Sequence, residues 1–335
     1  MSPTGLLRCF TPVVLVTACA APRPGVGTAR EVASPRGHSG YVAGAGGVRL
    51  FYQVDGAGPD TIVVLHGGPG LNLEGLRPDL RPLARRHALL YFDQRGSGRS
   101  DMPDTLDLTA ALMVEDLEAV RQAFHLDQLT LLGHSWGGGL ALLYAAHHAD
   151  RVRRLVLVGA VPPRLHPYFD QYLAAQASRH DSAEAARSAK LDSVMAVAPD
   201  PHAACRASNR IFLRGVAASP ETAERIKGDL CAGTSGNIRA AGTVLRRVWA
   251  SIIPGFVDGK FADLTYDWRP LAARVAARTL VVHGDRDPLP LAGSEEWVRL
   301  LPGARLVVIA NAGHYPHAEQ PDQFFPAVDA FLDGH

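Results

Sequence analysis

Short apolar runs alternate along most of the chain with segments that have helical periodicity. The runs are rich in Val, Leu and Ile, which is typical of strands buried on both faces of a sheet. One earlier segment, residues 48–54, alternates apolar and polar positions and predicts a half-exposed strand. The buried strands are expected at residues 61–66, 88–93, 129–132, 154–158, 279–283 and 305–310.

Apolar residues at helical spacing lie between these strands. Leu112, Leu117 and Val120 show this spacing in the second of the segments. The alternation of strand and helix predicts an α/β fold, with a mostly parallel, doubly wound sheet covered by helices on both faces. The helices are expected at residues 76–86, 108–124, 138–148 and 320–332.

The alternation stops at Pro162-Pro163 and resumes with the strand at 279–283. The residues between are alanine-rich and helical in pattern, without buried strand runs. We therefore expect a core formed by residues 45–161 and 262–335, with a helical cap at 162–261 inserted between them. No internal repeat and no transmembrane helix is evident in the sequence.

The N-terminal residues resemble a lipoprotein signal. Arg8 is followed by a short apolar stretch at 10–16, and Val-Thr-Ala-Cys at 16–19 is similar to a lipobox. We expect a signal peptide at 1–18, lipidation of Cys19 and a flexible tether at 19–44. This predicts an extracytoplasmic lipoprotein, anchored to a membrane in the periplasm or at the cell surface. A plain secretory signal and a misplaced start codon are the alternatives.

The charge of the chain limits the kinds of partner that it is expected to bind. The formal net charge is +1 with no basic stripe, so nucleic acid is not an expected partner.

Cys205 and Cys231 are the two cysteines that remain after the signal peptide and the lipidated Cys19 are set aside. An even pair outside the cytoplasm favours a disulfide, closing a loop of roughly 26 residues and stabilising the cap by about 3 kcal/mol. Two buried free thiols are the alternative. No Cys/His spacing indicates a metal, and no cofactor is expected.

The motif G-H-S-W-G at residues 133–137 stands between a buried strand and a helix, the setting of a nucleophile elbow. A serine hydroxyl is a weak nucleophile at neutral pH. It therefore needs a tight turn that presents it beside a base and beside oxyanion donors. We predict that Ser135 is the nucleophile. His134, inside the motif, is expected to serve packing.

In hydrolases with this elbow the acid precedes the histidine along the chain, and both follow the serine. Asp285 and Asp287 follow the strand at 279–283, and a carboxylate there lies at the same sheet edge as the elbow. We favour Asp287, because Asp285 lies within the tight turn and is expected to bond its own backbone. His314, on a loop after the strand at 305–310, is the predicted base, with His317 as the alternative.

The strand at 61–66 runs into the glycine-rich sequence H-G-G-P-G at residues 66–70. The elbow itself supplies one oxyanion donor, the backbone N–H of Trp136, and a second must come from the loop after the third strand. Gly68 is the expected second donor, because the absence of a side chain lets a carbonyl approach. Such donors contribute roughly 3 kcal/mol each in the transition state. An ordinary turn is the alternative.

Taken together, H-G-G-P-G at 66–70, D-Q-R-G-S-G-R-S at 93–100 and G-H-S-W-G-G at 133–138 resemble the proline iminopeptidase group of the α/β-hydrolases, serine peptidase family S33. The resemblance covers residues 45–160 and, less closely, 262–335. It implies a Ser135, Asp287 and His314 triad, oxyanion donors at Gly68 and Trp136, and a helical cap. It also implies removal of N-terminal residues, often proline, from short peptides.

The resemblance implies cap glutamates that hold the free α-amino group of the substrate, commonly near a Trp-Glu pair. Trp249 could be that tryptophan, but Ala250 follows it. Candidate amine contacts are Glu221 and Glu224 in the cap and Glu74 after the glycine-rich loop, and each can equally be an ordinary solvated residue.

The leading hypothesis is thus a serine hydrolase acting on peptide N-termini, of the prolyl aminopeptidase type. An esterase or amidase of the same fold, acting on other small acyl substrates, is the first alternative, and a non-catalytic binding protein is the second. The sequence carries no signature of oligomeric state.

Overall fold

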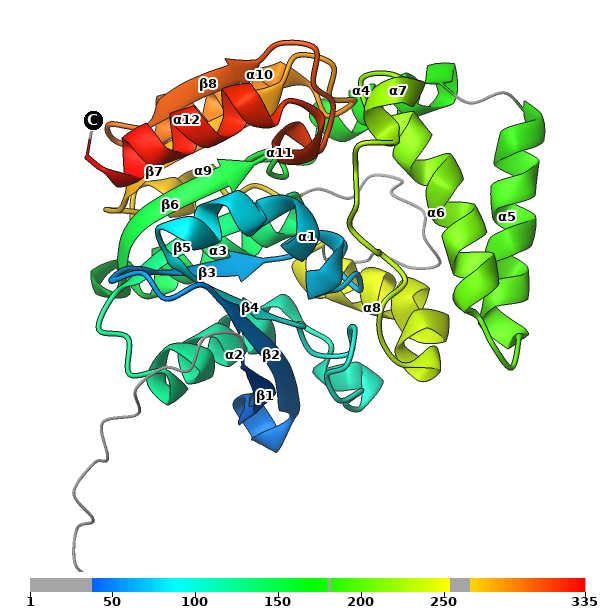
Figure 1. Cartoon of the computed structure of the whole chain (residues 1–335), viewed down its shortest axis with the longest axis horizontal. Helices are drawn as coiled ribbons and strands as arrows, with labels where there is room; N and C mark the ends of the chain where they lie inside the picture. Colours follow the sequence, from blue (N-terminus) through cyan, green and yellow to red (C-terminus); the bar gives the residue numbers. More distant parts are fainter. Residues whose placement is uncertain (1–37, 180–181, 254–265, 335) are drawn as a thin grey trace, which may run out of the picture. The chain divides into compact units, whose positions relative to one another are not determined.

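The computed structural model describes residues 38–179, 182–253 and 266–334. Within these residues eight strands form one sheet in the order β1-β2-β4-β3-β5-β6-β7-β8 (Figure 1). The first two strands pair antiparallel with each other and β2 pairs antiparallel with β4, whereas all other neighbours are parallel. The strands are β1 (Ser39–Ala43), β2 (Arg49–Asp55), β3 (Thr61–Leu65), β4 (Ala88–Phe92), β5 (Leu129–His134), β6 (Val152–Val158), β7 (Arg278–Gly284) and β8 (Arg305–Ile309).

Both faces of this sheet are buried at its centre, whereas the edge strands β1 and β8 are partly exposed. In β6, Leu155 and Leu157 belong to one apolar cluster, whereas Val156 and Val158 belong to another. Successive side chains of a strand point to opposite faces, so the two clusters lie on opposite sides of the sheet. The predicted doubly wound α/β architecture is confirmed. The helices of this core are α1 (Arg77–Leu80), α2 (Ala110–Ala123), α3 (Trp136–His147), α9 (Arg269–Ala272), α10 (Leu291–Leu300), α11 (Pro316–Glu319) and α12 (Pro321–Leu332).

Two local predictions were wrong. The helix expected at 76–86 is only the short α1, followed by the 3-10 helix η3 (Arg81–Arg85). Pro82 has no N–H to continue an α-helical ladder from α1. β1 also lies inside residues 19–44, the segment predicted to be a flexible tether. It is held by backbone pairing with β2, which its own Gly-containing sequence does not reveal.

Between β6 and β7 the described residues form helices only (Figure 1). The two ends of this cap meet: Arg164 and Asp267 form an antiparallel bridge, and the Trp268 N–H donates to the Pro163 carbonyl at 2.8 Å. The chain therefore leaves the core and returns to it at one place. The cap helices are α4 (Tyr168–Arg179), α5 (Ser182–Val197), α6 (His202–Val216), α7 (Pro220–Ala223) and α8 (Ser235–Ile252).

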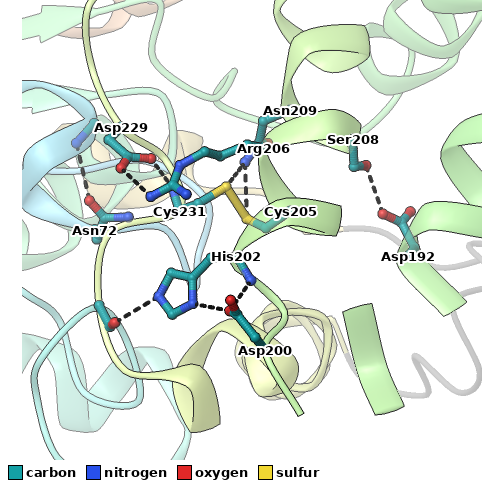
Figure 2. The surroundings of a disulfide bond; sticks show 12 residues. Asn72, Asp192, Asp200, His202, Cys205, Arg206, Ser208, Asn209, Asp229 and Cys231 are labelled. Atoms are coloured by element: carbon teal, nitrogen blue, oxygen red, sulfur yellow. Dashed lines mark hydrogen bonds and ion pairs between the residues drawn. A yellow bond between two sulfur atoms is a disulfide. The ribbon is translucent and has the colours of Figure 1, made fainter. Parts of the chain in front are cut away.

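A disulfide joins Cys205 of α6 to Cys231 in the loop between α7 and α8, with an S–S distance of 2.09 Å (Figure 2). The side-chain amide of Asn209 donates to both sulfur atoms, at 3.4 and 2.9 Å. The same loop is bonded to the core, because the Asp229 N–H donates to the Glu74 carbonyl at 3.1 Å. The disulfide thus fastens a cap helix to a segment that contacts the core.

The predicted signal peptide, the lipidated Cys19 and the tether up to residue 37 lie outside the described residues. Among those that are described, no helix combines the length and the apolar character needed to cross a membrane.

Candidate active site

Ser135 occupies a sharp turn between β5 and α3. Its φ of 56° and ψ of −120° are unusual for a residue with a side chain, and such backbone strain is typical of functional sites. Gly133 and Gly137 make the turn feasible, since a Cβ at either position would collide with backbone atoms. From Leu129 to Ala146, Ser135 is the one residue that is not buried. The fold therefore presents this hydroxyl and hides its neighbours.

His314 and Asp287 meet at the same edge of the sheet. The Nδ1 of His314 lies 2.8 Å from Oδ2 of Asp287, whose side chain is fully buried. The other carboxylate oxygen, Oδ1, accepts the Leu289 N–H at 2.9 Å, which fixes its orientation. An imidazole held through Nδ1 by a carboxylate has its Nε2 free to act as a base.

Gly159 connects this pair to the serine. It directly follows Val158, whose carbonyl accepts the Ser135 N–H at 2.9 Å. A Cβ atom at Gly159 would lie 3.0 Å from His314 Nδ1 and 3.1 Å from Asp287 Oδ2. Strand β6 therefore ends between the turn of Ser135 and the paired side chains.

The rival residues lie elsewhere. Asp285 accepts the Ala312 N–H at 3.3 Å, so its carboxylate bonds the backbone of the histidine loop and not, as had been expected, that of its own turn. His317 is buried, which lowers its pKa to about 3, and neither ring nitrogen has a partner among the described residues. His134 donates from Nε2 to the His314 carbonyl at 2.8 Å. Burial and two neighbouring histidines lower the pKa of His134, so it stays neutral.

The glycine-rich loop passes beside the serine. A Cβ atom at Gly67 would lie 3.1 Å from the Cβ of Ser135, and Gly68 follows with a φ of 114° that only glycine adopts readily. Trp136 begins α3, where peptide N–H groups have no acceptor within the helix. The two expected oxyanion donors, Gly68 and Trp136, thus belong to segments that both adjoin Ser135.

Gln94 ties these two segments together and was not predicted. Its side chain donates to the His66 carbonyl at 2.8 Å and accepts from the Trp136 indole at 2.9 Å. Its own N–H donates to Nε2 of His66 at 3.0 Å, so the His66 proton resides on Nδ1 and is donated to the Gly67 carbonyl at 2.9 Å. Burial lowers the pKa of His66 to about 4, which keeps this network intact near neutral pH.

The remaining motif, at residues 93–100, lies in the loop that follows β4. Asp93 accepts the N–H groups of Leu73 and Arg99 at 2.8 and 2.7 Å, and burial raises its pKa to about 7. Arg95 forms a fully buried ion pair with Asp116, at 2.7 Å. These contacts hold the loops that follow β3 and β4 in place.

The four candidate substrate contacts have different surroundings in the structure. Trp249 lies edge-to-face against Trp136, with ring centroids 5.5 Å apart, and is therefore close to the elbow. Glu74 accepts from Arg77 at 3.2 Å, and both Glu221 and Glu224 are exposed to solvent. Glu74 is thus engaged by a cation, and the two cap glutamates face solvent.

Tyr172 of α4 is a neighbour of the site that the sequence did not single out. Burial and the nearby charge of Asp287 raise its pKa to about 12, so it is a neutral phenol. Within the described chain, no group of three or more His, Cys, Asp or Glu side chains is arranged to hold a metal ion.

Known proteins share this architecture. The model of the alpha/beta hydrolase fold family matches residues 60–321. A proline iminopeptidase of Saccharolobus solfataricus is 27% identical over 305 residues, covering 86% of this chain and 90% of that protein. A proline iminopeptidase of Heyndrickxia coagulans is 38% identical over 119 residues, and this match covers 35% of the chain and only 41% of that relative.

Solved structures agree on the fold. A thermophilic esterase from Thermogutta terrifontis superposes with a TM-score of 0.63 at 21% identity, covering 88% of this chain and 98% of that one. The family match spans most of the chain and includes the segments that carry Ser135, Asp287 and His314. The chain belongs to the α/β-hydrolase fold family and is similar to its proline iminopeptidases.

Proposed function

We propose that this hydrolase removes N-terminal residues, proline in particular, from short peptides through a Ser135, Asp287 and His314 triad. The observation that carries the proposal is the Asp287 to His314 hydrogen bond, located beside the strained turn of Ser135. The full-length similarity to a proline iminopeptidase supports the choice of substrate.

In this mechanism Nε2 of His314 takes the proton of the Ser135 hydroxyl as Oγ attacks the carbonyl carbon of the scissile bond. The Gly68 and Trp136 N–H groups stabilise the resulting oxyanion. His314 then donates its proton to the leaving amine as the C–N bond breaks and an acyl-enzyme forms. A water molecule, deprotonated by His314, releases the acid and restores Ser135.

Replacement of Ser135 by Ala tests this proposal. We expect Ser135→Ala to lose turnover of a proline anilide and labelling by a fluorophosphonate, because both require the hydroxyl. Ser178→Ala, at an exposed position of α4, is the matched control and should retain both. Full turnover by Ser135→Ala would refute the triad. A native protein that never labels would instead favour a non-catalytic binding protein.

An esterase or amidase acting on other small acyl substrates is the second candidate. It is favoured by the placement of the glutamates, since Glu74 is paired with Arg77 while Glu221 and Glu224 are exposed. Rates with a proline anilide, its N-acetyl derivative and a simple ester separate the two. A strict need for the free amine decides for the peptidase, and indifference to it decides for the esterase.

We also propose that the chain acts outside the cytoplasm, anchored through lipidated Cys19. The Cys205–Cys231 disulfide supports an oxidising compartment. Cys19→Ala should release the protein from the membrane fraction, and unchanged fractionation would count against the anchor.

A further inference from the structure

Glu319, the last residue of α11, places a buried carboxylate between the histidine loop and the cap. The residue is 0% exposed. Its Oε2 accepts the Gly313 N–H at 3.0 Å and the Ala218 N–H at 2.7 Å. The same oxygen accepts the Thr222 hydroxyl at 2.8 Å, and Oε1 accepts the Tyr315 N–H at 3.0 Å. Four donors from two distant parts of the chain thus converge on one carboxylate.

Two of these donors flank His314. Gly313 and Tyr315 are its chain neighbours, and the His314 N–H is itself bonded to the Val216 carbonyl at 2.9 Å. All three consecutive N–H groups of the histidine loop are therefore engaged, two by Glu319 and one by the end of cap helix α6. These bonds fix the backbone at His314, and the fixed backbone keeps the imidazole ring beside Asp287.

The other two donors belong to the cap. Ala218 lies just before α7 and Thr222 lies in it, so the carboxylate joins the α6–α7 connection to the histidine loop. None of the four donors is a cation. Arg225, the nearest basic partner, donates at 2.8 Å to the backbone carbonyl of Glu319 and not to the carboxylate. A buried carboxylate without a paired cation is costly, and the four hydrogen bonds offset that cost only when both segments are in place.

We propose that Glu319 is a positioning residue, which sets the orientation of His314 and couples it to the α6–α7 connection of the cap. The inference rests on the proposed function, because it assumes that His314 is the base. An uncharged glutamine cannot replace the carboxylate fully. Its NH2 group would face an N–H or O–H donor at one of the two oxygen positions.

The test compares Glu319→Gln with Asp79→Asn. Asp79 is the matched control, since it is also buried and accepts two cap amides, from Lys227 at 3.0 Å and Gly228 at 3.1 Å, whereas Glu319 also accepts amides of the histidine loop. We expect Glu319→Gln to lower kcat and the rate of fluorophosphonate labelling by about 10- to 100-fold with little change in KM. Asp79→Asn should change kcat by less than about twofold. Rates are normalised to the folded fraction.

Thr222→Val keeps the carboxylate and removes one of its two cap-side donors, together with the bond that the Thr222 hydroxyl accepts from the Ser219 N–H. It guards against a Glu319→Gln protein that fails to fold. It should lower kcat by about 3- to 10-fold. The inference is overturned by the following result. Ser135→Ala is inactive, while Thr222→Val, and Glu319→Gln if it folds, have the same kcat as Asp79→Asn. An active Ser135→Ala would overturn the proposed function and this inference together.

Discussion

At the scale of single residues, Gly159 shows how little space separates the paired side chains from the sheet. Its φ is 50°, and a Cβ atom there would press on both His314 and Asp287. We expect Gly159→Ala to lower kcat at least about tenfold, because the hydrogen-bonded pair must move. The left-handed backbone should also lower the free energy of unfolding by about 1 kcal/mol.

Gly303→Ala is the control for that substitution. Gly303 has a similar φ of 68°, but no atom lies within 4 Å of the position where its Cβ would be. It should lose a comparable amount of stability, measured by urea denaturation, and keep its kcat. Equal kcat values for the two variants would mean that Gly159 does not confine the pair.

The residues of the proposed triad could be named from the sequence, whereas the residues that hold their loops in place could not. Ser135, Asp287 and His314 each follow a strand, and the chemistry requires them in that order along the chain. Gln94 and Glu319 act through backbone groups that are distant in sequence, such as His66 and Ala218. No local pattern marks such a contact before the chain is folded.

At the scale of elements, the disulfide ties α6 to the loop before α8 across a sequence separation of 26 residues. Its reduction should lower the free energy of unfolding by about 3 kcal/mol, because the unfolded chain regains the freedom of that loop. Denaturation with and without dithiothreitol measures the change. The double variant Cys205→Ala/Cys231→Ala should respond to denaturant identically under both conditions. A native protein that is indifferent to reductant would contradict the prediction.

Most strands were predictable because each is a continuous apolar run, and they were found within a few residues of their expected places. β8 is not the buried strand that its apolar run predicted, because it lies at the edge of the sheet and only Ile309 of its residues is buried. β1 was missed, since Gly40 and Ala43 give it little apolar signal and its stability comes from the pairing with β2. The helix expected after β3 is shorter than its apolar pattern predicts, because Pro82 has no N–H to continue the α-helical hydrogen bonds.

At the scale of the whole molecule, buried neutral histidines link stability to pH. His317 has a folded pKa of about 3, below the value of about 6.5 for an unfolded histidine. The unfolded chain therefore binds this proton first, and stability falls as the pH drops from about 6.5 toward 3. His66 and His134 add to the same trend, since burial lowers their pKa values also.

His317→Leu isolates one such contribution with a side chain of similar volume. Between pH 7 and pH 5 the native protein should lose about 2 kcal/mol more than the variant in its free energy of unfolding. Urea denaturation at the two pH values measures this difference. Equal losses in the two proteins would show that His317 does not carry the linkage.

The fold class and the presence of a helical insertion followed from the sequence, whereas the docking of that insertion did not. The cap is held by scattered backbone contacts, such as those of Asp79 with Lys227 and of Glu319 with Ala218. These depend on geometry and leave no periodic signal.

The bridge between Arg164 and Asp267 brings the two ends of the cap to neighbouring positions. A short turn joining those positions could close the chain with no change in the order of the core strands. The cap is consequently a segment that insertions and replacements can change. The residues of the proposed triad, which follow the core strands, would keep their places. Proteins that share such a core can therefore differ in their substrates while they keep the same reaction.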